Sequence, residues 1–149
     1  MRNTYTNGLL TKAEQGNVDS QSDSDWAAFS ILQEVQTEYD ANARPVVRRL
    51  VSGSTIYSLS QTRYDALGRP ECVAQRMNSA AFGSLPSSAC TLGTSGSFGP
   101  DRIVKTFRDA AGQVTKTTSA LGVTGVEADD VTTTYKVNGL VQTVTDAEN

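Results

Sequence analysis

The chain has 149 residues, enough for one domain of modest size, and at 38% hydrophobic and 19% charged residues it is lighter in both classes than an ordinary globular protein. The net charge of −3 comes without a basic stripe, no apolar run approaches the ~20 residues that cross a bilayer, and the amino end does not resemble a signal peptide. Histidine is absent, which excludes Ser-His-Asp and Cys-His catalysis and most zinc and haem sites.

A short pattern recurs along the chain, in which a tyrosine and an acid are followed by a turn and an arginine. Two ten-residue stretches show it most clearly, "QTEYDANARP" at residues 36–45 and "QTRYDALGRP" at residues 61–70. Such self-similarity indicates a repeat architecture. We count five degenerate copies across residues 1–149, with uneven spacing because two inserts interrupt them near residues 17–29 and 78–100.

The first copy is "NTYTNGLLTKAEQGN" at residues 3–17, which keeps the aromatic residue as Tyr5 and the glycine as Gly8. It is rich in strand-forming and turn-forming residues. The insert that follows, residues 17–29, is polar and acidic, so we predict a loop between strand pairs.

The second copy, residues 36–45, has Ala43 where the pattern has glycine. Alanine disfavours a positive φ by roughly 1 kcal/mol or more, and Asn42 tolerates that region better, so we expect a shifted or looser turn here. The segment before it, "DWAAFSILQEVQTEY", is ambiguous. A helix with Asp25 as its N-cap would suit the start, whereas alignment with the other copies favours a strand from about Leu32 onward.

The third copy contains the turn "DALG", which begins at Asp65 and ends at Gly68. Aspartate is favoured at the first position of a type I turn, since its carboxylate accepts from a backbone N–H two residues on. Glycine is favoured at the end, where the chain takes a positive φ and closes the hairpin with a bulge. Arg69 comes next, and pairing with the carboxylate of a neighbouring turn would give it a structural role.

The second insert, residues 78–100, is rich in Ser, Gly and Ala and is also predicted to be a loop. It contains Cys90, while Cys72 lies in the strand before it. The two cysteines cannot make a structural zinc site alone. They could form one disulfide, which would suit an oxidising compartment, or could equally be free and buried. Cys72 has no histidine to act as its base, which argues against a nucleophile.

The last two copies are "VKTFRDAAGQVTKTT" at residues 104–118 and "TTTYKVNGLVQTVTDAEN" at residues 132–149. Their flanks are β-branched and aromatic, as in strands. Alternation predicts two half-apolar faces, which comprise Ile103, Lys105 and Phe107 on one strand and Val131, Thr133, Tyr135 and Val137 on another. A single hairpin with such a face is not stable in water, whereas stacked hairpins bury a continuous sheet. The fold class that we predict is all-β, with tandem antiparallel β-hairpins in a curved sheet and tight bends at residues 40–43, 65–68, 109–112 and 137–139.

The signature Tyr-Asp-x-x-Gly-Arg resembles the YD repeat of RHS-repeat proteins. The closest match is "RYDALGRP", with degenerate matches in "EYDANARP", "FRDAAGQV", "YKVNGLV" and the terminal "VTDAEN". The departures are Ala43 for glycine, Arg108 between the aromatic residue and the acid, and no acid directly after Tyr135. The motif residues are Tyr39, Asp40, Tyr64, Asp65, Gly68, Arg69, Phe107, Asp109, Gly112, Tyr135 and Gly139.

The resemblance implies a β-sheet that spirals into a hollow shell. Bacterial members of the family enclose a toxic carboxy-terminal domain, and related shells occur in insecticidal toxin complexes and teneurins. It also implies an exported or cell-surface location, and partners that are neighbouring repeats of a longer parent chain and an enclosed toxin domain. The family's self-cleaving segment has no counterpart here, and the chain stops in mid-repeat, so we expect a piece of a larger shell.

The acidic residues do not form an obvious reactive site. Asp19, Asp23 and Asp25 lack the glycine and the bidentate acid of an EF-hand, which favours a solvated loop over a calcium site. Asp129 and Asp130 are neighbours on a predicted strand and would point to opposite faces, so they cannot straddle a glycosidic bond. We therefore expect no enzyme activity, no metal and no cofactor.

Two functional hypotheses remain. The first is a structural module that forms part of the wall of a β-shell. The alternative is an extracellular adhesion module that binds carbohydrate or protein, for which Trp26 is the one tryptophan and lies in a predicted loop. A weaker possibility is self-association through open sheet edges, because unpaired strands are templates for pairing. We expect neither nucleic-acid binding nor a membrane span.

Overall fold

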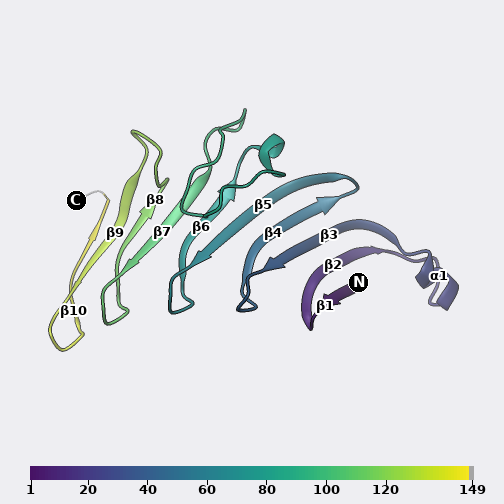
Figure 1. Ribbon diagram of the computed structural model, residues 1–149, viewed down its shortest axis with the longest axis horizontal. Helices are drawn as coiled ribbons and strands as arrows, with labels where there is room; N and C mark the ends of the chain where they lie inside the picture. Colours follow the sequence, from purple (N-terminus) through teal and green to yellow (C-terminus); the bar gives the residue numbers. More distant parts are fainter. Residues whose placement is uncertain (148–149) are drawn as a thin grey trace. The chain divides into compact units, whose positions relative to one another are not determined.

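The computed structural model describes residues 1–147 and has the all-β fold that the repeats predict. Ten antiparallel strands follow one another as consecutive hairpins, and their order in the sheet is their order in the chain, from β1 to β10 (Figure 1). The chain divides into two compact units, residues 1–60 and the residues from Gln61 onward. The end of the last quoted motif, at Glu148 and Asn149, lies outside the described residues.

The first unit contains the first two hairpins, a short helix and the start of a third hairpin. Its elements are β1 (Arg2–Thr6), β2 (Leu9–Asn17), α1 (Asp23–Ala27), β3 (Ser30–Tyr39), β4 (Pro45–Ser52) and the beginning of β5 (Thr55–Tyr64). Asn7 and Gly8 join β1 to β2 with φ values of 51° and 79°, as the two-residue turn of a tight hairpin requires. The apolar side chains buried in this unit are Phe29, Val47, Val51 and Leu59.

The second unit contains the remaining hairpins and the long insert. Its elements are the end of β5, β6 (Pro70–Arg76), a 3-10 turn (Ser79–Ala81), β7 (Arg102–Arg108), β8 (Val114–Ser119), β9 (Ala128–Tyr135) and β10 (Val141–Asp146). Figure 1 shows the insert as an irregular excursion between β6 and β7. The strands are thus the regular part of this unit, and the insert is built on them.

The hairpin bends lie where the repeats predict them. In the last four copies the amide of the fourth turn residue donates to the carbonyl oxygen of the first, at 3.0 Å for Ala43 to Asp40, Gly68 to Asp65 and Gly112 to Asp109, and at 2.8 Å for Gly139 to Lys136. The predicted bends at residues 40–43, 65–68 and 109–112 are confirmed, and the bend predicted at 137–139 begins one residue earlier.

The core of the second unit lies between the sheet and the insert. Cys72 and Ala74 on β6 and Ile103 on β7 are at most 1% exposed, and Ala89 of the insert packs against them. Burying one side chain of the size of Ile103 contributes roughly 1.5–3 kcal/mol. The insert is therefore a packed cover for one face of β6 and β7, and the sequence predicted only that it is a loop.

Two local predictions need correction. The helix in the first insert has Ser22 as its N-cap, accepting from the amide of Asp25 at 3.2 Å, so Asp25 is not the cap. The strand expected from about Leu32 onward is confirmed as β3, which begins at Ser30. Val137 does not share the face of β9, because that strand ends at Tyr135 and Val137 lies fully exposed in the turn that follows.

Candidate functional site

The repeated turn is organised by its aspartate. In the third copy one carboxylate oxygen of Asp65 accepts from the amides of Leu67 and Arg69, both at 2.9 Å, and the other accepts from Nε of Arg69 at 2.7 Å. The Arg69 amide, helped by the Arg69 side chain and the Leu67 amide, holds the pKa of Asp65 below its ordinary value, although burial alone would raise it. The Asp and Arg of the motif therefore hold the turn together, and we call this set of hydrogen bonds from the turn amides and the arginine to the aspartate the turn clamp.

The second copy builds the same clamp without glycine. Asp40 accepts from the amides of Asn42 (2.9 Å) and Arg44 (3.0 Å) and from Nε of Arg44 (2.7 Å), and chiefly the Arg44 side chain lowers the pKa of Asp40. Ala43 takes the glycine conformation at φ 61°. The expectation of a shifted or looser turn is wrong, because the Asp40 clamp holds alanine in a conformation that it disfavours.

The last two copies keep the backbone turn and lose parts of the clamp. Asp109 accepts from the amide of Gln113 at 2.9 Å, but Gln113 replaces the arginine. In the final copy Lys136 stands where the aspartate would be, and the turn relies on its backbone bonds and on Asn138, whose side chain accepts from the Leu140 amide at 3.2 Å. The turn geometry thus survives without the full motif.

Motif tyrosines fasten one hairpin to the preceding one. The hydroxyl of Tyr39 donates to the carbonyl oxygen of Leu10 at 2.9 Å, and the hydroxyl of Tyr135 donates to the carbonyl oxygen of Val114 at 2.8 Å. Leu10 and Val114 each lie two residues after a turn glycine, Gly8 and Gly112. The motif tyrosine is therefore a tie between repeats, in addition to being a packed aromatic residue.

The tyrosine position of the fourth copy is held by Arg108 and not by Phe107. Within its hairpin Arg108 pairs with Val114, two residues after Gly112, just as Tyr39 pairs with Pro45, two residues after Ala43. Phe107 instead lies opposite Lys116. The ammonium groups of Lys105 and Lys116 make cation–π contacts with its ring, each 4.6 Å from the ring centroid. Arg108 thus occupies the tyrosine position although the sequence pattern assigned that position to Phe107; its place directly before Asp109 was the signal that could have identified it.

Turns also contact the turn of the next repeat. Arg69 was expected to pair with a neighbouring turn carboxylate, but its carboxylate partner in the described residues is Asp65 of its own turn. The Nη1 atom of Arg69 lies against Gly112, and a Cβ added to Gly112 would lie 2.5 Å from that nitrogen. Gln113 makes the corresponding contact one repeat later, donating from Nε2 to the carbonyl oxygen of Gly139 at 2.8 Å.

The insert is fastened by a disulfide. Cys72 and Cys90 are joined, with their Cα atoms 5.3 Å apart, which decides between the bonded and free alternatives. Cys72 has no exposed surface. A bonded and buried sulfur of this kind is a structural link and does not act as a nucleophile.

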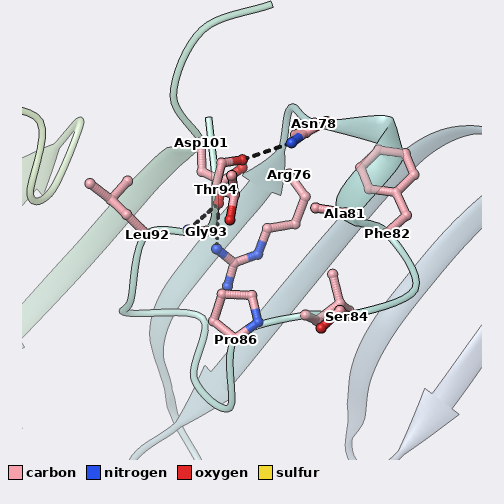
Figure 2. A pocket seen from close by; sticks show the side chains of 11 residues that line it. Arg76, Asn78, Ala81, Phe82, Ser84, Pro86, Leu92, Gly93, Thr94 and Asp101 are labelled. Carbon is pink, nitrogen blue, oxygen red and sulfur yellow. Dashed lines mark hydrogen bonds and ion pairs between the residues drawn. The ribbon is translucent and has the colours of Figure 1, made fainter. Parts of the chain in front are cut away.

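A buried arginine forms the second fastening. Arg76, 3% exposed, donates to Gln61 through Nε and Nη2, to the carbonyl oxygens of Thr91 (2.8 Å) and Ser88 (3.0 Å), and to Asp101 (2.6 Å). These five bonds use all five N–H donors of a guanidinium. Figure 2 shows Arg76 directed toward Asp101 in a small cavity that Pro86 and Leu92 of the insert help to line.

Both carboxylate oxygens of Asp101 also accept hydrogen bonds. Besides Arg76 it accepts from the amides of Met77 (2.9 Å) and Gly93 (2.8 Å). Burial acts to raise the pKa of Asp101, but Arg76 and the two amides together lower it. Because every polar atom of this ion pair is engaged, the cavity of about 220 Å³ beside it offers a ligand no free charged partner.

Three further acids that the sequence singled out are each held by neighbouring side chains. Asp25 accepts from Ser20, Asp129 accepts from Thr118 (2.6 Å) and Lys116 (3.1 Å), and Asp130 accepts from Ser119 (2.7 Å). Residues 1–147 contain no cluster of three or more acidic, cysteine or histidine side chains placed to hold a metal. No helix in that part of the chain is long and apolar enough to span a bilayer.

No protein-family model matches the sequence, and no curated protein matches it. The functional reading therefore depends on the turn clamps, the ties between repeats and the fastened insert.

Proposed function

We propose that this chain is a structural repeat module, forming part of the wall of an RHS-type β-shell that encloses or presents a carboxy-terminal toxin domain. The observation that carries the proposal is the recurrence of one hairpin with one kind of tie to its neighbour, seen at Tyr39 and Leu10 and again at Tyr135 and Val114. The polar groups of the motif stabilise the turns and link consecutive hairpins, as is expected of a structural repeat.

The fastened insert supports the same proposal. A wall segment must stay folded while it carries an enclosed domain across an oxidising compartment, and the Cys72–Cys90 bond is of the kind that persists there. We therefore infer a location outside the cytosol, as a secreted or cell-surface module; the disulfide is what supports this inference. Its partners would be adjoining repeats and the enclosed domain.

The proposal is tested on the native product. An antibody raised against this chain should detect a polypeptide several times larger than 15.9 kDa, within which the chain resists limited proteolysis under conditions that cleave exposed linkers. Detection of only a free 15.9-kDa product, cleaved as readily as an unprotected domain, would rule out the wall role.

A second candidate is adhesion to carbohydrate. It is favoured by a polar groove of about 680 Å³ in the first unit, whose lining includes Thr11, Gln36, Glu38 and Arg49. The aromatic partner is less suitable, because Trp26 is stacked on Phe29 with ring centroids 5.9 Å apart. A glycan array decides: reproducible binding that Arg49→Ala or Trp26→Ala abolishes would favour adhesion over the wall role.

A further inference from the structure

An apolar groove lies in the second unit, at the end of β7 and β8 opposite to the turn that joins them. It has a volume of about 510 Å³ and is formed where the insert and the β8–β9 connection, residues 120–127, adjoin these two strands. Figure 1 shows both connections at the same end of the strands. We call this feature the Phe98 groove. Most of the residues that line it are apolar, among them Phe98, Pro100, Val104, Val123 and Val126.

The apolar surface of the Phe98 groove is open to solvent. Phe98, Val126 and Val104 are 73%, 62% and 41% exposed. Exposed apolar side chains that are scattered singly need no explanation, but three that gather around one hollow are typical of a binding site. The volume lies within the range of pockets that hold small molecules, roughly 300–1,000 Å³.

The β8–β9 connection is held against its neighbours. The amide of Leu121 donates to the carbonyl oxygen of Ile103 on β7 at 3.1 Å, and the Leu121 side chain packs against the core of the second unit. A Cβ added to Gly122 would lie 3.1 Å from Cδ1 of Leu92, so this connection also contacts the insert. The groove is therefore preformed, and a ligand would not have to order this wall.

Within the connection, hydrogen bonds and a strained residue fix the backbone. The amide of Val123 donates to the carbonyl oxygen of Ala120 at 2.9 Å, and the amide of Val126 donates to that of Val123 at 3.0 Å. Ala120, which also lines the groove, has a φ of 48°, a left-handed conformation that costs alanine roughly 1 kcal/mol or more. Strain of this kind persists only where the surroundings impose it, and it is concentrated at ligand sites.

Among the lining residues one charge is uncompensated, and it is positive. Arg102 is exposed and has no carboxylate partner in residues 1–147. Asp101 also lines the groove but is paired with Arg76, and Asp130, which accepts from Ser119 at 2.7 Å, is not part of the lining. A ligand of this groove thus meets an apolar surface and one guanidinium, which favours an anionic group on an apolar body.

A small molecule suits the groove better than a polypeptide segment. A bound segment gains most of its affinity from pairing with an open strand edge or from a row of pockets for alternate side chains. Both strands beside the groove are already paired on their two sides, β7 with β6 and β8, and β8 with β7 and β9. The groove thus offers a single hollow and no backbone to pair with.

We propose that the Phe98 groove binds a small amphipathic carboxylate. The aromatic or branched aliphatic body of the ligand lies between Phe98 and Val126, and its carboxylate pairs with the guanidinium of Arg102. A carboxylate is the matching anion because the planar guanidinium presents parallel N–H donors to its two oxygens. The inference goes beyond the proposed function and does not depend on it, because both connections lie outside the repeated hairpin motif.

The probe is phenylacetate, titrated into the isotope-labelled full chain at neutral pH. It should cause saturable shifts of amide resonances within residues 98–104 and 119–127, with a dissociation constant on the order of a millimolar, as expected of a ligand of this size. Phenylacetamide has the same ring without the charge. It should bind about fivefold more weakly, the equivalent of about 1 kcal/mol for one exposed ion pair.

Two pairs of variants separate the charge from the apolar surface. Arg102→Gln should weaken phenylacetate about fivefold and leave phenylacetamide unchanged, whereas Arg48→Gln, at an exposed arginine of the first unit, should change neither affinity. Val126→Asn should weaken both ligands, whereas Val137→Asn, at an exposed valine in the turn after β9, should weaken neither. The amide spectrum outside the groove shows that each variant is folded.

The proposal is overturned if phenylacetate gives no saturable shifts or shifts centred elsewhere, if acid and amide bind equally, or if Arg102→Gln leaves the affinity for phenylacetate unchanged. Concentration-dependent shifts of the groove in the chain alone would also overturn it, since the occupant would then be a second copy. So would equally tight binding of N-acetylphenylalaninamide, which represents a phenylalanine within a polypeptide. None of these results bears on the wall role, which is judged by the size and protease protection of the native product.

Discussion

Within a repeat, the aspartate of the motif does more than start a turn. At Asp40 and Asp65 one carboxylate receives two backbone amides and one guanidinium, so the residues two and four positions later are fixed together. This explains why arginine follows the turn in these two copies. It also explains how Ala43 can replace glycine, because the clamp offsets the strain of φ 61°.

Ala43→Gly should stabilise the protein. Glycine adopts a positive φ without the penalty of a Cβ, so we expect the free energy of unfolding to rise by about 1 kcal/mol. Urea denaturation followed by circular dichroism measures the change. The matched control is Ala41→Gly in the same turn, where φ is not positive and the added flexibility should give no gain. An Ala43→Gly protein no more stable than the parent would show that residue 43 is unstrained.

Arg108 is the weak member of the tyrosine series. Its Nη1 is buried without a hydrogen-bond partner among the described residues, whereas Tyr39 and Tyr135 each donate to a carbonyl oxygen of the preceding hairpin. An unsatisfied buried donor carries the full cost of its desolvation. β7 pairs with β6 in the register in which β3 pairs with β2, because Lys105 lies opposite Cys72 as Gln36 lies opposite Lys12. A tyrosine at position 108 would therefore face the carbonyl oxygen of Pro70, as Tyr39 faces that of Leu10.

Arg108→Tyr should therefore raise the free energy of unfolding by about 1 kcal/mol, through removal of the orphaned donor and gain of one hydrogen bond. Urea denaturation measures it. Arg108→Phe separates the two contributions, because it removes the donor and supplies the ring but not the hydroxyl. If the tyrosine variant is no more stable than the phenylalanine variant, the tyrosine hydroxyl does not form a hydrogen bond between β7 and β6.

At the scale of elements, the hairpins were predictable, the Cys72–Cys90 disulfide was one of two open alternatives, and the Arg76–Asp101 ion pair was not predictable. Asp-x-x-Gly is a local signal, since the residues that make the turn are adjacent in the chain. The Arg76–Asp101 pair joins residues 25 positions apart, and nothing near either residue in the sequence announces the other. Arg108 was hidden for a different reason: the aromatic Phe107 beside it resembles the motif more closely than an arginine does.

The disulfide should be the main support of the insert. For a cross-link that spans 18 positions, loss of the constraint on the unfolded chain is worth about 3 kcal/mol. We expect the Cys72→Ala/Cys90→Ala protein to unfold at correspondingly lower urea concentration. Amide exchange should accelerate in residues 78–100 and along β6 and β7. Equal stability with the bond present and absent would assign the insert's order to packing and to Arg76.

At the scale of the whole chain, stability is distributed over repeats. Each strand pairs with its neighbours in the sequence, so the folding free energy is approximately a sum of terms for the hairpins and for the strand pairs that join consecutive hairpins. Depressed carboxylate pKa values recur along the chain, at Glu14 beside Arg2 and at Asp40, Asp65 and Asp101. A condition that neutralises carboxylates should therefore act on many repeats at once.

Acid is such a condition, and the sign follows from the direction of the shifts. A carboxyl group whose pKa is lower in the folded than in the unfolded chain contributes stability above its unfolded value, about 3.9–4.3, and loses that contribution as the pH falls through the folded value. Stability should thus be level from about pH 7 to pH 5 and fall below about pH 4. Urea midpoints across this range measure it. The Asp40→Asn/Asp65→Asn protein should start lower at pH 7 and lose less on acidification, because two clamps have already been neutralised, and an equal acid dependence in the two proteins would mean that these clamps do not hold the turns through charge.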